Sequence, residues 1–379
     1  MQARKAARPE ALSAGIWRSS PWRRGGWRAV CSPFNPRMGG APSPATLPRR
    51  ISTMPTRRQV LGALAAAPAL SLPSLARAQA DYPTRAIQML VGFAPGGGTD
   101  IVARMLAPAL QARLGQPVAV ENRPGASGTI ASAAAARARP DGYTLVMGTV
   151  STQSVVAPLM ANPPYDQMRD FTPLTLAGTV PMVVMVPGNA PYRDLAGLLD
   201  YARKNPGKLN YASSGVATQQ HLSAEMLSQA AGVSMTHVPY RGTGQVVNDL
   251  LAGTLDLVID TLPTHLPHIR GGATRALAVT TPDRVPVLPD LPTVAESGFP
   301  GFSITTWYML LGPAGLPRPV VDRWSEAMNA ALSEPALRKR LEETGYLVGG
   351  GSPEDAAALV RQEAERYGAL VQRAGIRID

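Results

Sequence analysis

The segment from Phe93 to Asp100 has the residue types of an anion-binding loop. It reads Phe-Ala-Pro-Gly-Gly-Gly-Thr-Asp, follows an alternating apolar run, and precedes a helical pattern of apolar residues that begins at Ile101. Glycines let backbone N–H groups approach a ligand, and a helix N-terminus adds partial positive charge. A strand, a glycine turn and a helix start therefore predict a cradle for an anion.

Two common nucleotide-binding patterns do not match this loop. A P-loop requires a lysine after its last glycine, and no lysine follows Gly98. The dinucleotide fingerprint requires a third glycine at position 101, which is Ile101. The anion is therefore not expected to be a nucleotide, and a tight turn without any ligand remains the structural alternative.

Catalytic patterns are scarce elsewhere in the chain. No Gly-x-Ser-x-Gly sequence occurs, so a nucleophile elbow has no support. His265 and His268 could share a helical face, but Pro263 and Pro267 interrupt that stretch and no acidic pair has metal-ligand spacing. Capping or surface roles are expected for both histidines.

Two aspartates and one tyrosine could contribute to a cleft. Asp100 either acts as a general base or braces the glycine loop, and bracing is the favoured interpretation. Asp260 stands at a predicted strand end, where it either points into the cleft or is a turn acid. Tyr240 could line the cleft, whereas Arg241 could equally be a surface charge.

The net charge of +11 is concentrated in the first 80 residues. Residues 1–80 contain thirteen Lys and Arg and a single acid, Glu10, so residues 81–379 carry a net charge of −1. The basic balance therefore gives no reason to expect a nucleic-acid partner. The single cysteine, Cys31, also lies in this segment, so disulfides and cysteine chemistry are not expected after residue 80.

Residues 54–80 have the pattern of a signal peptide. Arg57 and Arg58 precede an apolar stretch, 60–72, that is too short to span a membrane, and small-x-small sequences favour cleavage after Ala80. The twin arginines indicate a twin-arginine signal, with ordinary secretion left open. Residues 1–53 lie upstream of this complete signal and are predicted to be a non-native extension, with translation starting at Met54.

Strand-like and helix-like patterns alternate after residue 81, which predicts an α/β fold. A second strand, small-residue turn and helix occurs at 209–227, about 120 residues after the first. Further strands are expected at 118–121, 143–148, 182–186, 257–260, 276–280 and 307–311, and further helices near 126–138, 194–205 and from Ser352 onward. Pro108 should kink or shorten the helix after the glycine loop.

Together these features resemble the periplasmic substrate-binding proteins of tripartite tricarboxylate transporters, the Bug (TctC-like) group. The resemblance covers nearly all of residues 81–379. Besides the loop 93–100, its markers are the segments 121–128, 140–143, 205–211, 237–242, 266–269, 277–280 and 291–296.

This resemblance implies two α/β lobes that are joined by two crossing strands and close on a ligand like a flytrap. Lobe one is expected at 81–186 and 306–379, and lobe two at 187–305. The implied function is periplasmic capture of a small carboxylate (a di- or tricarboxylate, an amino acid or an aromatic acid) for the membrane components of such a transporter. A ligand-sensing partner of a membrane sensor kinase and a secreted hydrolase or isomerase are the alternatives.

The resemblance also implies which residues hold the ligand carboxylate, largely through backbone N–H groups and ordered water. Carried onto this sequence, they are Phe93, Gly96, Gly97, Thr99, Asp100, Thr149, Ser151, Thr152, Ser213, Ser214, Ala217, Thr218, His221, Tyr240 and Asp260. No catalytic residue, cofactor or metal is expected, and the protein is expected to be a monomer. Ala217 stands where the family commonly has glycine, and Thr261-Leu262 replaces a more usual polar Asn in that turn. Both changes concern the distal part of the ligand.

Overall fold

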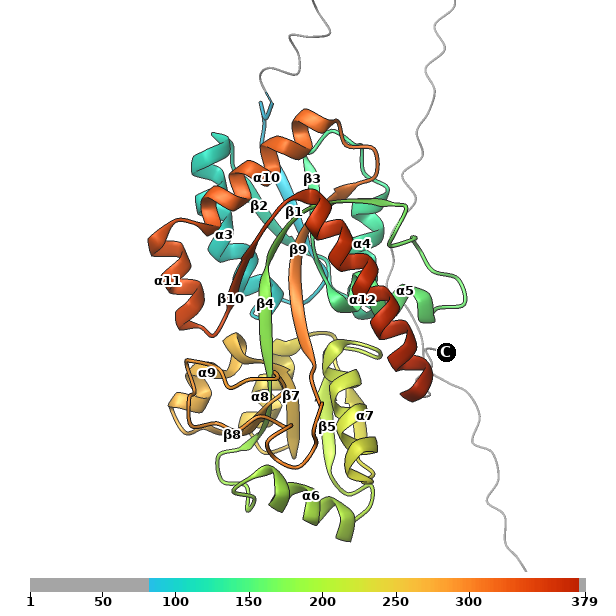
Figure 1. Ribbon diagram of the computed structural model, residues 1–379, viewed down its shortest axis with the longest axis vertical. Helices are drawn as coiled ribbons and strands as arrows, with labels where there is room; N and C mark the ends of the chain where they lie inside the picture. Colours follow the sequence, from blue (N-terminus) through green and yellow to red (C-terminus); the bar gives the residue numbers. More distant parts are fainter. Residues whose placement is uncertain (1–81, 375–379) are drawn as a thin grey trace, which may run out of the picture. The chain divides into compact units, whose positions relative to one another are not determined.

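The computed structural model describes residues 82–374 (Figure 1). The expectations for the extension 1–53, the signal peptide 54–80 and the cleavage site at Ala80 lie outside the described residues. Within the described residues, no helix is both long and apolar enough to cross a bilayer.

The first half of the fold is built on a mixed sheet with the strand order β2-β1-β3-β9-β4-β10. Strands β1, β2 and β3 run parallel, whereas β9 is antiparallel to β3 and β4. The strands of this sheet are β1 (Ile87–Val91), β2 (Val118–Asn122), β3 (Thr144–Thr149), β4 (Phe171–Pro187), β9 (Thr305–Pro313) and β10 (Leu347–Gly350). We call this sheet and its helices lobe one.

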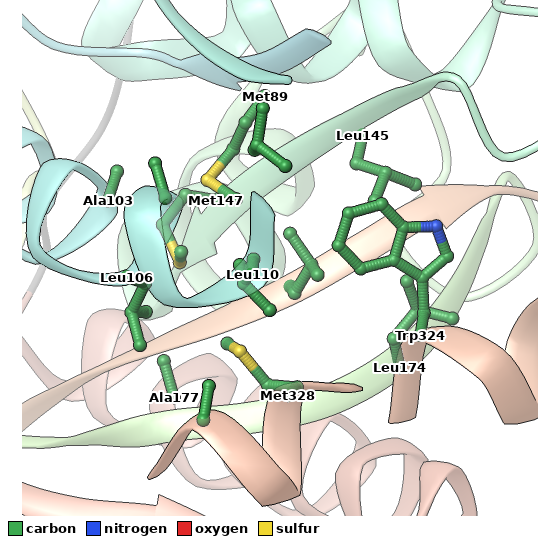
Figure 2. Close-up of a cluster of buried hydrophobic side chains, with 14 of the residues drawn as sticks. Met89, Ala103, Leu106, Leu110, Leu145, Met147, Leu174, Ala177, Trp324 and Met328 are labelled. Atoms are coloured by element: carbon green, nitrogen blue, oxygen red, sulfur yellow. The ribbon is translucent and has the colours of Figure 1, made fainter. Parts of the chain in front are cut away.

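Helices cover both faces of this sheet (Figure 1). One face packs against α3 (Gly98–Leu114), α10 (Arg318–Leu332) and α11 (Pro335–Glu343). The other face packs against α4 (Thr129–Ala136), α5 (Val156–Leu159) and α12 (Pro353–Ala374), together with the short turns η1 (Ala126–Gly128) and η2 (Ser151–Val155). Figure 2 shows part of the first of these layers, where Leu106 and Leu110 of α3 and Trp324 and Met328 of α10 pack with Leu145 and Met147 of β3.

The second half of the fold, lobe two, is built on a sheet with the order β8-β4-β7-β5-β6. Its strands besides β4 are β5 (Asn210–Ser213), β6 (Thr236–Pro239), β7 (Leu257–Thr261) and β8 (Thr274–Val279). One face packs against α6 (Leu195–Lys204) and α7 (Gln219–Ala231), the other against α8 (Thr243–Leu251) and α9 (Leu262–Arg270).

Strand β4 belongs to both sheets. Pro181 is the last residue that pairs with β9, and Met182 is the first that pairs with β7. Val183 and Met185 face the α8–α9 layer while Val184 faces the α6–α7 layer, as the two-residue period of a strand requires. The return segment crosses at Ile304, just before β9, so the fold has the expected pair of crossing strands.

Thr280 connects the two crossing segments. Its backbone N–H donates to Met182 O (2.9 Å), and its backbone carbonyl accepts from Ile304 N–H (2.9 Å). Its hydroxyl lies within hydrogen-bond distance of the carbonyl oxygens of both residues (3.2 and 2.5 Å). This fully buried threonine therefore holds both strands together where they pass between the lobes.

The expectation that Pro108 shortens the first helix is wrong. Helix α3 continues through Pro108 to Leu114. Pro108 lies on the exposed side, where water can hydrate the Arg104 carbonyl that the missing N–H would have bonded. On the opposite side Leu106 and Leu110 are fully buried, and their packing maintains the helix.

Candidate functional site

The glycine loop joins β1 to α3 and is fixed from behind by Asp100. The Asp100 carboxylate accepts hydrogen bonds from Gly96 N–H (3.0 Å), Arg104 Nε (2.9 Å) and Asn122 Nδ2 (2.9 Å). Burial opposes ionisation, but these three hydrogen bonds outweigh it and lower the pKa of Asp100. The interpretation of Asp100 as a brace for the loop is confirmed.

The opposing turn, 213–218, joins β5 to α7 and is held by its own side chains. Ser213 Oγ donates to Gly215 O (2.8 Å), and Thr218 Oγ1 donates to the same carbonyl (2.7 Å). Ala217 has a left-handed backbone (φ 56°), and its N–H donates to His221 Nδ1 (2.9 Å). A glycine would adopt this conformation without strain, which gives a physical reason for glycine at this position.

A small cavity of about 30 Å³ lies between the two turns. This is enough space for ordered water. The side chains and backbone around it come from both lobes, and every described residue that lines it is uncharged. They are Phe93, Gly97, Gly98, Thr99, Thr149, Ser151, Met182, Ser214, Gln219, Gln220, Thr243, Thr261, Thr306 and Tyr308.

The structure separates the sequence-based site residues into two groups. Those that line the cavity are Phe93, Gly97, Thr99, Thr149, Ser151 and Ser214. Those that do not line it are Gly96, Asp100, Thr152, Ser213, Ala217, Thr218, His221, Tyr240 and Asp260. Most of the second group support the first: Thr152, for example, donates its N–H to Thr149 Oγ1 and accepts Thr149 N–H on its own hydroxyl.

Sequence reasoning missed eight lining residues: Gly98, Met182, Gln219, Gln220, Thr243, Thr261, Thr306 and Tyr308. Gly98 and the pair Gln219-Gln220 had a signal, because they adjoin the two recognised turns. Thr261 also had one, because it directly follows Asp260. Thr243 and Thr306 had none, since only the folding of distant segments brings them to the cavity.

Five helices begin at this cavity. Gly98, Ser151, Gln219 and Thr243 are the first residues of α3, η2, α7 and α8, and Thr261 is the N-cap of α9. The N-cap residues of α3, α7, α8 and α9 make no side-chain capping hydrogen bond, whereas Asp194 caps α6 (2.8 Å to Gly197 N). The first N–H groups of a helix have no intrahelical acceptor, so converging starts concentrate donors and positive potential.

The two lobes touch around the cavity. Gln219 N–H of α7 donates to Ser151 Oγ of η2 (3.0 Å), and Ser127 Oγ donates to Val216 O (2.7 Å). A Cβ atom on Gly98 would lie 2.7 Å from Thr261 Oγ1 and 2.4 Å from Tyr308 Oη. The absence of a side chain at Gly98 thus allows Thr261 of lobe two to lie close to the glycine loop of lobe one.

A buried polar chain orients one wall of the cavity. Asp260 accepts from Gln220 Nε2 (3.0 Å) and from Thr261 N–H (2.6 Å), and His265 Nε2 lies 3.2 Å from its other oxygen. The far end of Gln220, Oε1, accepts from Ser214 Oγ (3.1 Å). Asp260 therefore positions Gln220, and Gln220 in turn accepts the hydrogen bond that the Ser214 hydroxyl donates.

The expected surface or capping role of His265 is wrong. His265 is fully buried in α9 and contacts Asp260. Pro263 does not interrupt the helix because it occupies its first turn, where no intrahelical N–H is needed, and Pro267 lies near the other end.

A stack of three rings supports α7 from the other side. His221 and His237 are parallel, with centroids 4.0 Å apart, and His237 stacks on Tyr211 at 4.9 Å. Burial lowers the pKa of His221 to about 4, and burial together with the neighbouring His221 lowers that of His237 to about 4. Both rings are therefore neutral at pH 7, and His221 uses Nδ1 to hold the turn rather than to contact the cavity.

No charged or metal-binding cluster complements this site in residues 82–374. No group of three or more His, Cys, Asp or Glu side chains there could hold a metal ion. Burial, together with the charge of Asp260, raises the pKa of Tyr308, so this phenol stays protonated and can only donate or accept a hydrogen bond. The chemistry available is recognition by neutral donors and acceptors.

Two α/β lobes on shared crossing strands, with a polar cavity between helix starts, define a periplasmic binding protein fold. The family model described as the tripartite tricarboxylate transporter family receptor, TctC, matches residues 102–376. The chain belongs to this family. Its members are substrate-binding proteins and not enzymes, which confirms the expectation of a solute-binding protein.

Individual relatives agree with this assignment. The UPF0065 protein of the tcbD-tcbE intergenic region of Pseudomonas sp. (strain P51) is 40% identical over 83% of this chain and 94% of its own length. An R. palustris protein solved with adipate is 36% identical, with a TM-score of 0.76 over 78% of this chain and 99% of its own. MatC from Rhodopseudomonas palustris, solved with malate, is 34% identical, with a TM-score of 0.73 over 76% of this chain and 100% of its own.

Proposed function

We propose that this protein captures a small carboxylate between its lobes and delivers it to the membrane components of a tripartite tricarboxylate transporter. The observation that carries the proposal is the convergence of five helix starts on one uncharged cavity. Several N–H donors can together offset the desolvation of a carboxylate without a fixed cation. The adipate and malate bound by two relatives support the same ligand class.

In this proposal the carboxylate lies against the start of α3 and is covered by the start of α7. Phe93, Gly97, Thr99, Thr149, Ser151 and Ser214 contact it directly or through water, together with Gly98, Gln219 and Tyr308. Gly96, Asp100, Thr152, Ser213, Ala217, Thr218, His221, Tyr240 and Asp260 act by holding these groups in place. Because the cavity is small, a ligand of several carbons would hold the lobes farther apart.

Closure follows from the same contacts. A ligand that touches both lobes stabilises the closed form by its differential affinity for it. The proposed lobe boundaries, 81–186 with 306–379 and 187–305, are supported by the passage of β4 between sheets near Met182 and by the return of the chain at Ile304. We also propose export to the periplasm with cleavage near Ala80, and action as a monomer.

A thermal-shift and calorimetric screen of the purified protein against mono-, di- and tricarboxylates tests the binding function. The matched amides of the same acids serve as controls, because they keep the shape and remove the charge. We expect stabilisation by at least one acid and none by its amide. Absence of stabilisation across the panel would contradict the proposal.

Export has a separate test. N-terminal sequencing of the protein recovered from a periplasmic extract should begin at Asp81. A product that retains residues from before Met54 would contradict both the predicted start and the signal peptide.

A further inference from the structure

A second, larger cavity adjoins the first. Its volume is about 270 Å³, and it shares Phe93 and Ser214 with the small cavity as walls. The remaining lining residues come from the turns after β1, β5 and β6, from the η1 loop, and from α5 and the residue that follows it. They are Gly92, Gly125, Ala126, Ser127, Gly128, Val156, Met160, Gly215, Val216, Tyr240 and Arg241.

This larger cavity also lies between the lobes, because contacts between them bound it on two sides. On one side Ser127 Oγ donates to Val216 O (2.7 Å). On the other, Gly242 approaches the glycine loop so closely that a Cβ atom on it would lie 2.6 Å from Ala94 Cβ. Arg241 directly precedes Gly242, so its backbone is fixed at the seam between the lobes.

Much of the cavity wall is apolar. Phe93, Val156, Met160 and Val216 supply hydrocarbon surface. Among the described residues that line it, Arg241 carries the only charge. Arg241 is exposed and forms no ion pair within residues 82–374, while the neighbouring Tyr240 hydroxyl donates to Asp249 Oδ2 (2.5 Å).

The η1 loop, which also lines this cavity, has an unusual backbone. Ala126 and Ser127 both have left-handed conformations (φ 45° and 54°), which are rare for residues with a side chain. Such strain persists where the surrounding structure determines it, often at binding sites. Here it turns the loop so that its backbone forms one wall of the cavity and Ser127 reaches lobe two.

We propose that this cavity is the distal subsite for a dicarboxylate whose second carboxylate pairs with Arg241. The first carboxylate lies in the small cavity, and an apolar spacer passes between Phe93 and Ser214 onto Val156, Met160 and Val216. The inference rests on the proposed function, since it extends the same ligand into the neighbouring cavity. It assigns to Arg241, which the sequence left open as a surface charge, the selection of dicarboxylates over monocarboxylates.

Calorimetric titration with acids matched in chain length tests this assignment. The dicarboxylates are succinate, glutarate, adipate and pimelate, and their partners are butanoate, pentanoate, hexanoate and heptanoate. We expect wild-type protein to bind the dicarboxylate of fitting length about ten-fold more tightly than its partner, the factor expected of a hydrogen-bonded charge. The preference should decrease as salt is added, because Arg241 is exposed to solvent.

Substitutions identify the group responsible. Arg241→Gln should abolish the preference and leave monocarboxylate affinity within about two-fold, and Arg241→Lys should retain part of it. Arg193→Gln is the matched control, because Arg193 is an exposed lobe-two arginine that lines neither cavity. Thermal unfolding of each variant verifies that it is folded.

The outcomes separate the two proposals. If Arg241→Gln keeps the wild-type preference, or if wild-type protein shows none, the distal subsite is wrong while carboxylate capture stands. If wild-type protein binds no acid of either series, carboxylate capture fails and the distal subsite fails with it.

Discussion

Gln220 Nε2 donates a hydrogen bond to Asp260 Oδ1 across 3.0 Å, and this contact determines which way the glutamine amide faces. Asp260 is buried and already accepts Thr261 N–H, so it can take only a donor from Gln220. Gln220 Oε1 must then face Ser214 and accept a hydrogen bond from its hydroxyl group. Ser214 consequently presents only lone pairs to the cavity.

This orientation predicts a preference for carboxylates that carry a hydroxyl or ammonium donor beside the carboxyl group. Malate should bind several-fold to ten-fold more tightly than succinate, the value of about one hydrogen bond to a neutral acceptor. In Asp260→Asn the new amide can donate a hydrogen bond to Gln220. The Gln220 amide can then turn around, so that the Ser214 hydroxyl no longer has to donate to it and can donate to the cavity instead. Calorimetry should show that this variant has lost most of the preference.

Ser214→Ala is the companion variant, because it removes the acceptor without disturbing Asp260. It should lose the preference for malate while succinate affinity stays within about three-fold. If both variants keep the wild-type ratio, Ser214 does not act as the acceptor.

Gly98 and Gly97 offer a matched test of lobe closure. A Cβ atom on Gly98 would lie 2.4 Å from Tyr308 Oη and 2.7 Å from Thr261 Oγ1, whereas one on Gly97 would have nothing nearer than 3.6 Å. Gly98→Ala should therefore lower ligand affinity at least about ten-fold and cost about 1–3 kcal/mol of stability through overpacking. Gly97→Ala keeps its backbone N–H and has room for the new Cβ atom, so it should allow closure and lower affinity less than Gly98→Ala.

Ligand titration and small-angle scattering of both variants measure these effects. Gly98→Ala should remain in the open form at ligand concentrations that close Gly97→Ala. Equal closure of the two variants would show that the approach of Thr261 to Gly98 is not needed for binding.

The sequence could predict the two turns but not how the rest of the site is assembled around them. Each turn is a local pattern, a strand followed by small residues and a helix, and both lie at the cavity as expected. Tyr308 is brought there by the pairing of β9 with strands far away in the chain, and Thr243 by the position of the α8 N-terminus. Neither carries a local signal. The prediction for His265 fails because a helix tolerates proline in its first turn, where Pro263 lies.

The length of β4 also could not be predicted from the local sequence. Only 182–186 reads as a buried strand, while Pro173 and Pro181 argue against a strand before it. The structure accommodates Pro173 beside a register irregularity in the pairing with β9. Tertiary pairing, rather than local propensity, extends the strand to seventeen residues and makes it the connection between the lobes.

Thr280 should couple the two crossing strands. Thr280→Val removes the hydroxyl that approaches Met182 O and Ile304 O, with little change in shape. We expect a loss of about 1–2 kcal/mol in the free energy of unfolding, because a buried carbonyl loses a partner. We also expect altered ligand affinity, since the hydroxyl links the segments that connect the lobes.

Thr281→Val is the control, because the Thr281 hydroxyl donates locally to Asp283 O (2.7 Å). It should lower stability without changing affinity. Chemical denaturation and calorimetry measure the two quantities, and unchanged affinity in Thr280→Val would exclude a role for this contact in closure.

The stacked histidines predict a specific loss of stability in mild acid. His221 and His237 have pKa values of about 4 in the folded protein, against about 6.5 in an unfolded chain. Between these values the unfolded state binds more protons than the folded state, so stability rises with pH. The contribution is complete above about pH 6.5 and is lost progressively as the pH falls toward 4.

The size of the pKa shift sets the loss in the free energy of unfolding. The loss is up to about 3 kcal/mol for the buried His221 and less for His237, which is partly exposed. Urea denaturation at pH 7.5 and pH 5.0 measures the difference. His237→Phe keeps a ring in the stack but cannot titrate, so its stability should depend less steeply on pH over this window. The carboxylates with lowered pKa values, such as Asp100, contribute mainly below pH 4 and do not obscure the comparison. Parallel pH profiles for the variant and the wild type would show that His237 does not titrate as its burial requires.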